Sequence, residues 1–207
     1  LLMAELQVKE YNDPDQARPL LKSLIESQKE NLRDNERVLA KAYEFFVDLM
    51  EEGPESRLLS KKVAKLEEGI RRLSSSHIFE LLKRKASLQE RMGRIAASAN
   101  TWSKAAELAP DASESARCSK RAIESMLASK QWDRAKLALN QILASGAPAK
   151  EREELRRLLK STAAKEQIAS LRRSLNWDDP ENPQNFDIFL KQAKLYMYPL
   201  GDFRKAE

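Results

Sequence analysis

The sequence is poor in the residues that carry most catalytic and metal-binding chemistry. It has one histidine, His77, one cysteine, Cys118, and five glycines among 207 residues. A single cysteine cannot form a disulfide within the chain, which fits a reducing compartment. The sequence contains no cluster of cysteine and histidine and no glycine-rich phosphate loop. We therefore expect neither a metal nor a cofactor.

Long apolar stretches are also missing. No run approaches the roughly 20 residues that a membrane-spanning helix needs. The first residues, Leu1 to Glu5, lack the basic stretch and the apolar core of a signal peptide. We therefore expect no membrane insertion and a cytoplasmic location. Because the first residue is leucine, we also expect the natural protein to extend beyond this sequence.

The residues that could carry catalysis stand alone. Cys118 has basic neighbours that could lower the pKa of its thiol, but no partner base is visible, and we interpret it as a small, half-buried helical residue. His77 follows three serines at an expected helix start, where it serves as a surface or capping residue. Adjacent glutamates such as Glu51 and Glu52 point about 100° apart on a helix and do not converge. The sequence therefore predicts no enzymatic activity. An enzyme whose site is completed by flanking segments remains an alternative that the lone histidine disfavours.

What remains is a chain rich in helix-forming residues, 42% of it hydrophobic, without β-branched strand runs. This composition predicts an almost purely α-helical protein. Apolar residues recur at alternating three- and four-residue steps from Leu59 to Leu73 and again from Ile78 to Ile95. Three serines separate the two stretches, so we expect an antiparallel helical hairpin here.

This expected hairpin is the most basic part of the chain. Residues 57–94 hold eleven Lys and Arg against four Glu, although the whole chain has a net charge of only +5. Such a patch could bind nucleic acid or an acidic protein, or could simply be solvated. Aromatic residues that would stack on bases are missing there, apart from one that we assign to the core. The candidate binding residues are Lys61, Lys62, Lys65, Lys83, Arg84 and Lys85.

A short pattern recurs in the second half of the chain. An aromatic residue is followed three positions later by alanine at Trp102 and Ala105, at Trp132 and Ala135, and at Phe203 and Ala206. This unit resembles the tetratricopeptide repeat, a helix-turn-helix of 34 residues. In that family the alanine admits a neighbouring backbone and the aromatic fills the adjoining gap. The best-formed unit is at Trp132, which we therefore expect to be a buried anchor between helices.

The resemblance implies a right-handed array of helical hairpins, an α-solenoid. It covers about half of the chain, and residues 31–98 fit the pattern poorly. We accordingly expect N-terminal hairpins, including the basic pair, over residues 1–99, and tetratricopeptide-like repeats over residues 100–207. The last repeat, beginning at Phe203, is cut off halfway.

Repeat arrays bind partners on a concave surface formed by the first helix of each pair. The resemblance places Glu90, Arg94, Arg117, Lys120 and Glu124 on that surface. Glu124 stands where some family members use asparagine to clamp a terminal carboxylate, so we do not expect that clamp. The chain is thus predicted to be a non-enzymatic scaffold or adaptor that binds a partner protein or peptide, with an acidic partner as one candidate. The alternative is a nucleic-acid-associated factor that uses the basic hairpin of residues 57–94. The pattern leaves the oligomeric state open.

Overall fold

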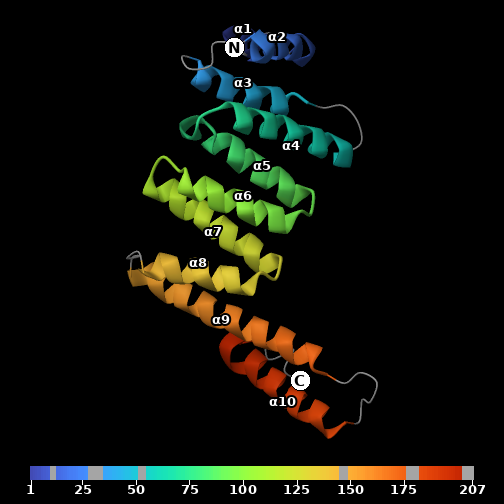
Figure 1. Ribbon diagram of the computed structural model, residues 1–207, viewed down its shortest axis with the longest axis vertical. Coiled ribbons are helices and arrows are strands. Elements are labelled where there is room, and N and C mark those ends of the chain that lie inside the picture. The colour runs from blue at the N-terminus through green and yellow to red at the C-terminus, as the bar shows by residue number, and fades with distance from the viewer. Residues whose placement is uncertain (10–12, 28–34, 51–54, 145–148, 176–181, 202–207) are drawn as a thin grey trace. The chain divides into compact units, whose positions relative to one another are not determined.

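The computed structural model describes residues 1–9, 13–27, 35–50, 55–144, 149–175 and 182–201 (Figure 1). Throughout these ranges every regular element is a helix, and consecutive helices pack on each other from α1 to α6 and from α8 to α10. The expected all-α helical array is therefore confirmed. The helices are α1 (Leu2–Lys9), α2 (Pro14–Ser27), α3 (Glu36–Asp48), α4 (Glu55–Arg72), α5 (Phe79–Arg91), α6 (Ile95–Glu107), α7 (Ala112–Ala128), α8 (Trp132–Ala144), α9 (Ala149–Arg173) and α10 (Pro183–Leu195), with a 3-10 turn, η1 (Ser75–His77), and a π-helical turn, η2 (Tyr196–Leu200).

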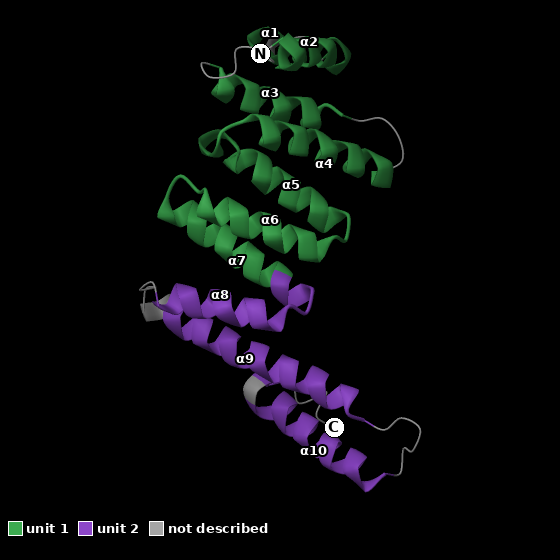
Figure 2. Ribbon diagram, in the orientation of Figure 1, with its two compact units in different colours: residues 1–125 green, residues 126–207 purple. Residues whose placement is uncertain are grey.

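The chain divides into two compact units, residues 1–125 and residues 126–207 (Figure 2). Unit 1 contains α1 to α6 and most of α7. From α1 to α5, each helix packs on the next one in the sequence. In unit 2, α8 packs on α9, and α9 packs on both α10 and η2. The division that we expected after residue 99 falls inside α6, a helix of unit 1 that packs on α5.

The basic segment forms the expected hairpin of α4 and α5. The two helices pack together, and η1 joins them. The predicted apolar stripe is buried at Leu59, Val63 and Leu66 of α4 and at Leu81 of α5, whereas Leu88 of α5 is half-buried. Its lysines and arginines therefore lie on the remaining faces of both helices.

The recurring aromatic and alanine residues have different environments. Ala105 and Ala135 are both fully buried, as helix packing requires of the small residue. Trp102 of α6 is only 8% exposed, whereas Trp132, at the start of α8, is half-buried. The expectation that Trp132 is a buried anchor is therefore wrong, and Trp102 has that role. Phe203 and Ala206 lie outside the described residues.

Within the described ranges, no helix combines the length and the apolar character needed to cross a bilayer.

Candidate partner-binding surfaces

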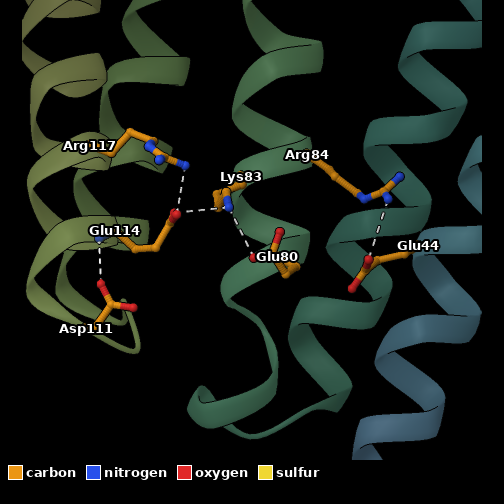
Figure 3. A network of polar contacts seen from close by, with 7 residues as sticks. All are labelled: Glu44, Glu80, Lys83, Arg84, Asp111, Glu114 and Arg117. Carbon is orange, nitrogen blue, oxygen red and sulfur yellow. Dashed lines mark hydrogen bonds and ion pairs between the residues drawn. The ribbon is translucent and has the colours of Figure 1, made fainter.

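Two of the predicted basic residues on α5 are bound to acidic side chains of other helices (Figure 3). Lys83 Nζ lies 3.1 Å from Glu80 Oε1 and 3.2 Å from Glu114 Oε2 of α7. Arg84 forms ion pairs with Asp48 and, at 3.5 Å, with Glu44, both of α3. Burial opposes the charge of Lys83, but its hydrogen bonds to Glu80 and Glu114 outweigh it and raise the pKa of the ammonium. These two cations therefore hold α3, α5 and α7 together.

The remaining candidates of the hairpin divide into paired and unpaired lysines. Lys85 Nζ lies 2.8 Å from Glu67 Oε1, and Lys65 Nζ lies 2.8 Å from Glu68 Oε2. Lys61 is exposed and Lys62 is half-buried, and neither has an ion-pair partner in the described part of the chain. Four of the six candidates are thus engaged in intramolecular ion pairs, which lowers the positive charge that the hairpin offers to a polyanion.

The candidates for the concave surface are exposed. Arg94 precedes the first turn of α6, and Arg117, Lys120 and Glu124 are spaced so that they share one face of α7. Arg117 Nη1 lies 2.8 Å from Glu114 Oε1, so part of this face extends the network of Figure 3. The structure brings three of the four onto one helix, and leaves them accessible to a partner.

Glu90, also expected on that surface, has a different role. Its Oε1 accepts hydrogen bonds from Trp102 Nε1 at 2.7 Å, from Ser98 Oγ at 3.1 Å and from Ser125 Oγ at 3.1 Å. These donors come from α6 and α7, so one carboxylate oxygen of α5 joins three helices. A charged acceptor with three donors is a strong local constraint, and Glu90 is therefore a packing residue of unit 1.

The lone cysteine is buried in the core, and the lone histidine contacts a neighbouring helix. Cys118 is 1% exposed, and burial raises the pKa of its thiol despite the nearby basic residues. His77 Nδ1 lies 3.0 Å from Glu36 Oε2 of α3, so the histidine ties η1 to α3. The hydrogen bond from Ser74 and the contact with His77 lower the pKa of Glu36. The described residues include no group of three His, Cys, Asp or Glu arranged to hold a metal ion.

An open cleft of about 980 Å³ lies in unit 2, and the sequence analysis did not identify it. One face of α9 forms much of its wall, because residues 161, 165, 168, 169 and 172 recur at helical spacing. Lys130 and Trp132 from the start of α8 and Tyr196 and Leu200 of η2 complete the lining. Four of the described lining residues are basic and none is acidic: these are Lys130, Lys165, Arg172 and Arg173.

The four cations of this cleft differ in how firmly they are held. Arg172 Nη2 donates to Tyr196 Oη at 3.0 Å, and Arg173 Nε donates to the carbonyl of Ala169 at 3.3 Å. Lys130 and Lys165 are exposed, and their side chains have no partner among the described residues. Two oriented guanidinium groups and two available ammonium groups therefore face the same open space.

Two acidic residues next to the cleft form ion pairs with a lysine that does not line it. Lys136 Nζ lies 2.6 Å from Glu166 Oε2 and 2.9 Å from Asp133 Oδ1. The hydrogen bonds with Glu166 and then Asp133 raise the pKa of Lys136. The carboxylates that follow Lys165 and Trp132 in the sequence thus have a cation of their own.

The net charge is distributed unequally between the two units. Residues 126–207 contain 15 Lys and Arg against 11 Asp and Glu, a net charge of +4, whereas residues 1–125 contain 22 against 21, a net charge of +1. The excess that we located in the hairpin is offset by the other residues of unit 1, which hold 11 Lys and Arg against 17 Asp and Glu, a net charge of −6. Unit 2 carries most of the net charge and contains the basic cleft.

A second accessible surface of unit 2 is apolar. Phe186, Phe189 and Leu190 share one face of α10 by their spacing, and 66%, 49% and 45% of each is exposed. Contiguous exposed apolar side chains are typical of interaction surfaces.

Comparison with known proteins leaves the chain without an assigned family. No family model and no curated protein matches it. Among solved structures it is similar to one titled "Crystal structure of BtubC (BKLC) from P. vanneervenii", with 14% sequence identity. That match covers 93% of this chain and 86% of the other, with a TM-score of 0.40. A likeness at this level does not define the function or the repeat type.

Proposed function

We propose that this chain is a non-enzymatic interaction scaffold, built of tetratricopeptide-like helical hairpins, that binds a segment of a partner protein. The observation that carries this proposal is the open cleft of unit 2, whose lining combines four basic residues with Trp132 and Tyr196. Aromatic and arginine side chains around a concave surface are enriched where proteins bind one another.

The fate of the reactive side chains supports a binding role over catalysis. The thiol of Cys118 is buried, His77 is bonded to Glu36, and Glu90 is saturated by three donors. A catalytic acid, base or nucleophile needs to reach a substrate, and these groups instead connect helices.

Nucleic-acid binding through the hairpin is the second candidate. Four of its six proposed cations form intramolecular ion pairs, and releasing Lys83, Arg84 and Lys85 for phosphate would break contacts of α5 with α7, α3 and α4. Lys61 and Lys62 remain available, but two contacts support only weak phosphate binding at physiological salt.

The test is the effect of charge reversal in the cleft on the affinity for an identified partner. Chains that co-purify from the source cell would be identified, prepared as pure proteins and titrated against the purified chain. Lys165→Glu should weaken binding about tenfold, because a charge-assisted hydrogen bond is worth about 1.5–3 kcal/mol.

Lys160→Glu is the matched control, since Lys160 is an exposed residue of the same helix and does not line the cleft. Equal affinities for Lys165→Glu and Lys160→Glu would overturn the cleft as the binding site. Loss of binding only in a Lys61→Glu, Lys62→Glu double variant would move the function to the hairpin.

A further inference from the structure

We propose that the cleft of unit 2 recognises an acidic peptide segment in which a bulky apolar side chain lies between two carboxylates. This inference rests on the proposed scaffold function and specifies the chemistry of the partner. It follows from the charge of the cleft, from the spacing of its cations and from the apolar residues between them.

The lining selects for negative charge. Among the described lining residues four are basic and none is acidic, and Lys136 already pairs with the carboxylates of Asp133 and Glu166 beside the cleft. A basic ligand would meet repulsion from these cations, whereas carboxylates would find Lys130 and Lys165, whose side chains have no other partner in the described part of the chain.

The spacing along α9 matches that of an extended peptide. Lys165 and Arg172 are seven residues apart, so they lie two turns apart on one face, separated by about 10.5 Å along the helix axis. In the polyproline II conformation side chains repeat their direction every three residues, after an advance of about 9 Å. Two carboxylates three residues apart in such a peptide can therefore face both cations at once.

The residues between these cations are apolar. Ile168 and Ala169 occupy the turn between Lys165 and Arg172, and Leu200 contributes from η2. Trp132 adds a half-buried indole to the lining. A polyproline II helix has three rows of side chains, and two of these rows can rest on one surface. A bulky apolar side chain between the two carboxylates, in the second row, would then cover these residues, with a gain of about 1.5–3 kcal/mol for full burial.

The same observations disfavour a nucleic acid as the ligand. Among the described residues four cations line the cleft, and two of them are also bonded within the chain, Arg172 to Tyr196 Oη and Arg173 to the carbonyl of Ala169, which limits how many phosphates the cleft can contact. Few phosphate contacts give weak binding at physiological salt. A peptide gains from the apolar floor as well as from the charges.

The experiment is fluorescence anisotropy of labelled synthetic peptides with the purified full chain. The probe contains two aspartates three residues apart with a phenylalanine between them. A second peptide replaces both aspartates by asparagine, and a third replaces phenylalanine by serine. We expect the probe to bind at least about tenfold more tightly than either replacement, each of which removes one of the two contributions.

Variants locate the site. Lys165→Glu should lower the affinity for the acidic probe at least about tenfold, and Lys160→Glu should leave it unchanged. Circular dichroism and a thermal melt of each variant check that α9 remains folded. Equal binding of the aspartate and asparagine peptides, or equal affinities of the two variants, would overturn the inference.

The affinity for a single-stranded oligouridylate, measured in the same way, tests nucleic acid as the alternative ligand. If it bound more tightly than the acidic probe and lost that affinity with Lys165→Glu, the ligand would be a nucleic acid and the inference would be wrong. If an identified protein partner bound in a Lys165-dependent way while the acidic probe did not, the scaffold function would stand and only this ligand chemistry would fail. Insensitivity of the protein partner to Lys165→Glu would instead count against the proposed scaffold site.

Discussion

Gly69 of α4 lies directly against the aromatic ring of Tyr43 of α3. A β-carbon added at Gly69 would be 2.9 Å from Cγ of that ring and 3.1 Å from a methyl group of Leu81. Tyr43 is fully buried, its hydroxyl donates to Glu68 Oε1 at 2.9 Å, and the hydroxyl accepts from Arg72 Nη1 at 2.7 Å. Because the backbone of α3 fixes one end of the tyrosine and these hydrogen bonds fix the other, its ring has little freedom to move away from a new side chain.

We predict that Gly69→Ala destabilises the protein, by up to about 2 kcal/mol. Alanine in a helix would ordinarily gain about 1 kcal/mol over glycine, but the overpacking against Tyr43 costs about 1–3 kcal/mol. Denaturant unfolding measures the difference. In a Tyr43→Ala background the same change should become neutral or stabilising, and a persistent loss there would mean that the ring is not the cause.

The two tryptophans should respond differently to the same substitution. Trp102→Phe removes the N–H that Glu90 accepts at 2.7 Å, and should cost about 1–3 kcal/mol. Trp132→Phe should cost less than about 1 kcal/mol, because Trp132 is half-buried. Paired thermal and urea melts compare them. Equal losses would show that Trp132 is the anchor after all.

Alkaline pH should weaken unit 1 through Tyr43. Burial, followed by the hydrogen bond to Glu68, raises the pKa of its phenol to about 12 from the ordinary value of 10.0. The unfolded chain therefore releases this proton first, and the stability that the neutral phenol contributes is complete below pH 10 and is lost between about pH 10 and 12. Urea titrations over that interval should show a decline on the order of 1–2 kcal/mol.

Tyr43→Phe is the control for this pH dependence. The variant starts less stable, because Glu68 and Arg72 lose the hydroxyl, but its stability should decline less across the same interval. An identical decline in both proteins would assign the effect to other tyrosines and lysines.

The contact between Lys83 and Glu114 should be a structural ion pair. Both side chains are largely shielded from solvent, and the pair joins α5 to α7. We expect Lys83→Glu to cost about 1–3 kcal/mol, since it places like charges beside Glu80 and Glu114. Adding Glu114→Lys should recover part of that loss in a double-mutant cycle. If Lys83→Glu were neutral in stability, Lys83 would be available to a ligand.

The local sequence predicted the positions of the helices well, but it predicted poorly how much of their positive charge is left to bind an anion. The stripe from Leu59 to Leu73 identified α4 because a helix repeats its buried face every three to four residues. The hairpin of α4 and α5 looked strongly basic because counting along the sequence omits Glu44, Asp48 and Glu114, which pair with Lys83 and Arg84 of α5 from α3 and α7. Counting charges along the chain therefore overestimated the hairpin as an anion-binding surface.

The cleft of unit 2 is a site that the local sequence does not reveal. Lys165 and Arg172 were visible as helical residues, but Lys130, Trp132 and Tyr196 come from segments far apart in the sequence. Only the packing of α9 with α8 and η2 makes them neighbours. A pattern search along one segment has no access to such a set.

Trp102 and Trp132 mark the boundary between what the sequence by itself determined and what only the tertiary structure decided. The sequence determined that both begin an aromatic and alanine pattern on a helix, since backbone propensity and side-chain periodicity act over a few residues. It also determined that Ala105 and Ala135 are buried, because a small residue on the apolar face is placed where helices meet. Which tryptophan became an anchor was decided by neighbours from other helices. Ser98 and Ser125 donate to the same carboxylate oxygen of Glu90 that holds Trp102, while Trp132 borders an open cleft, because burial depends on contacts that no local pattern contains.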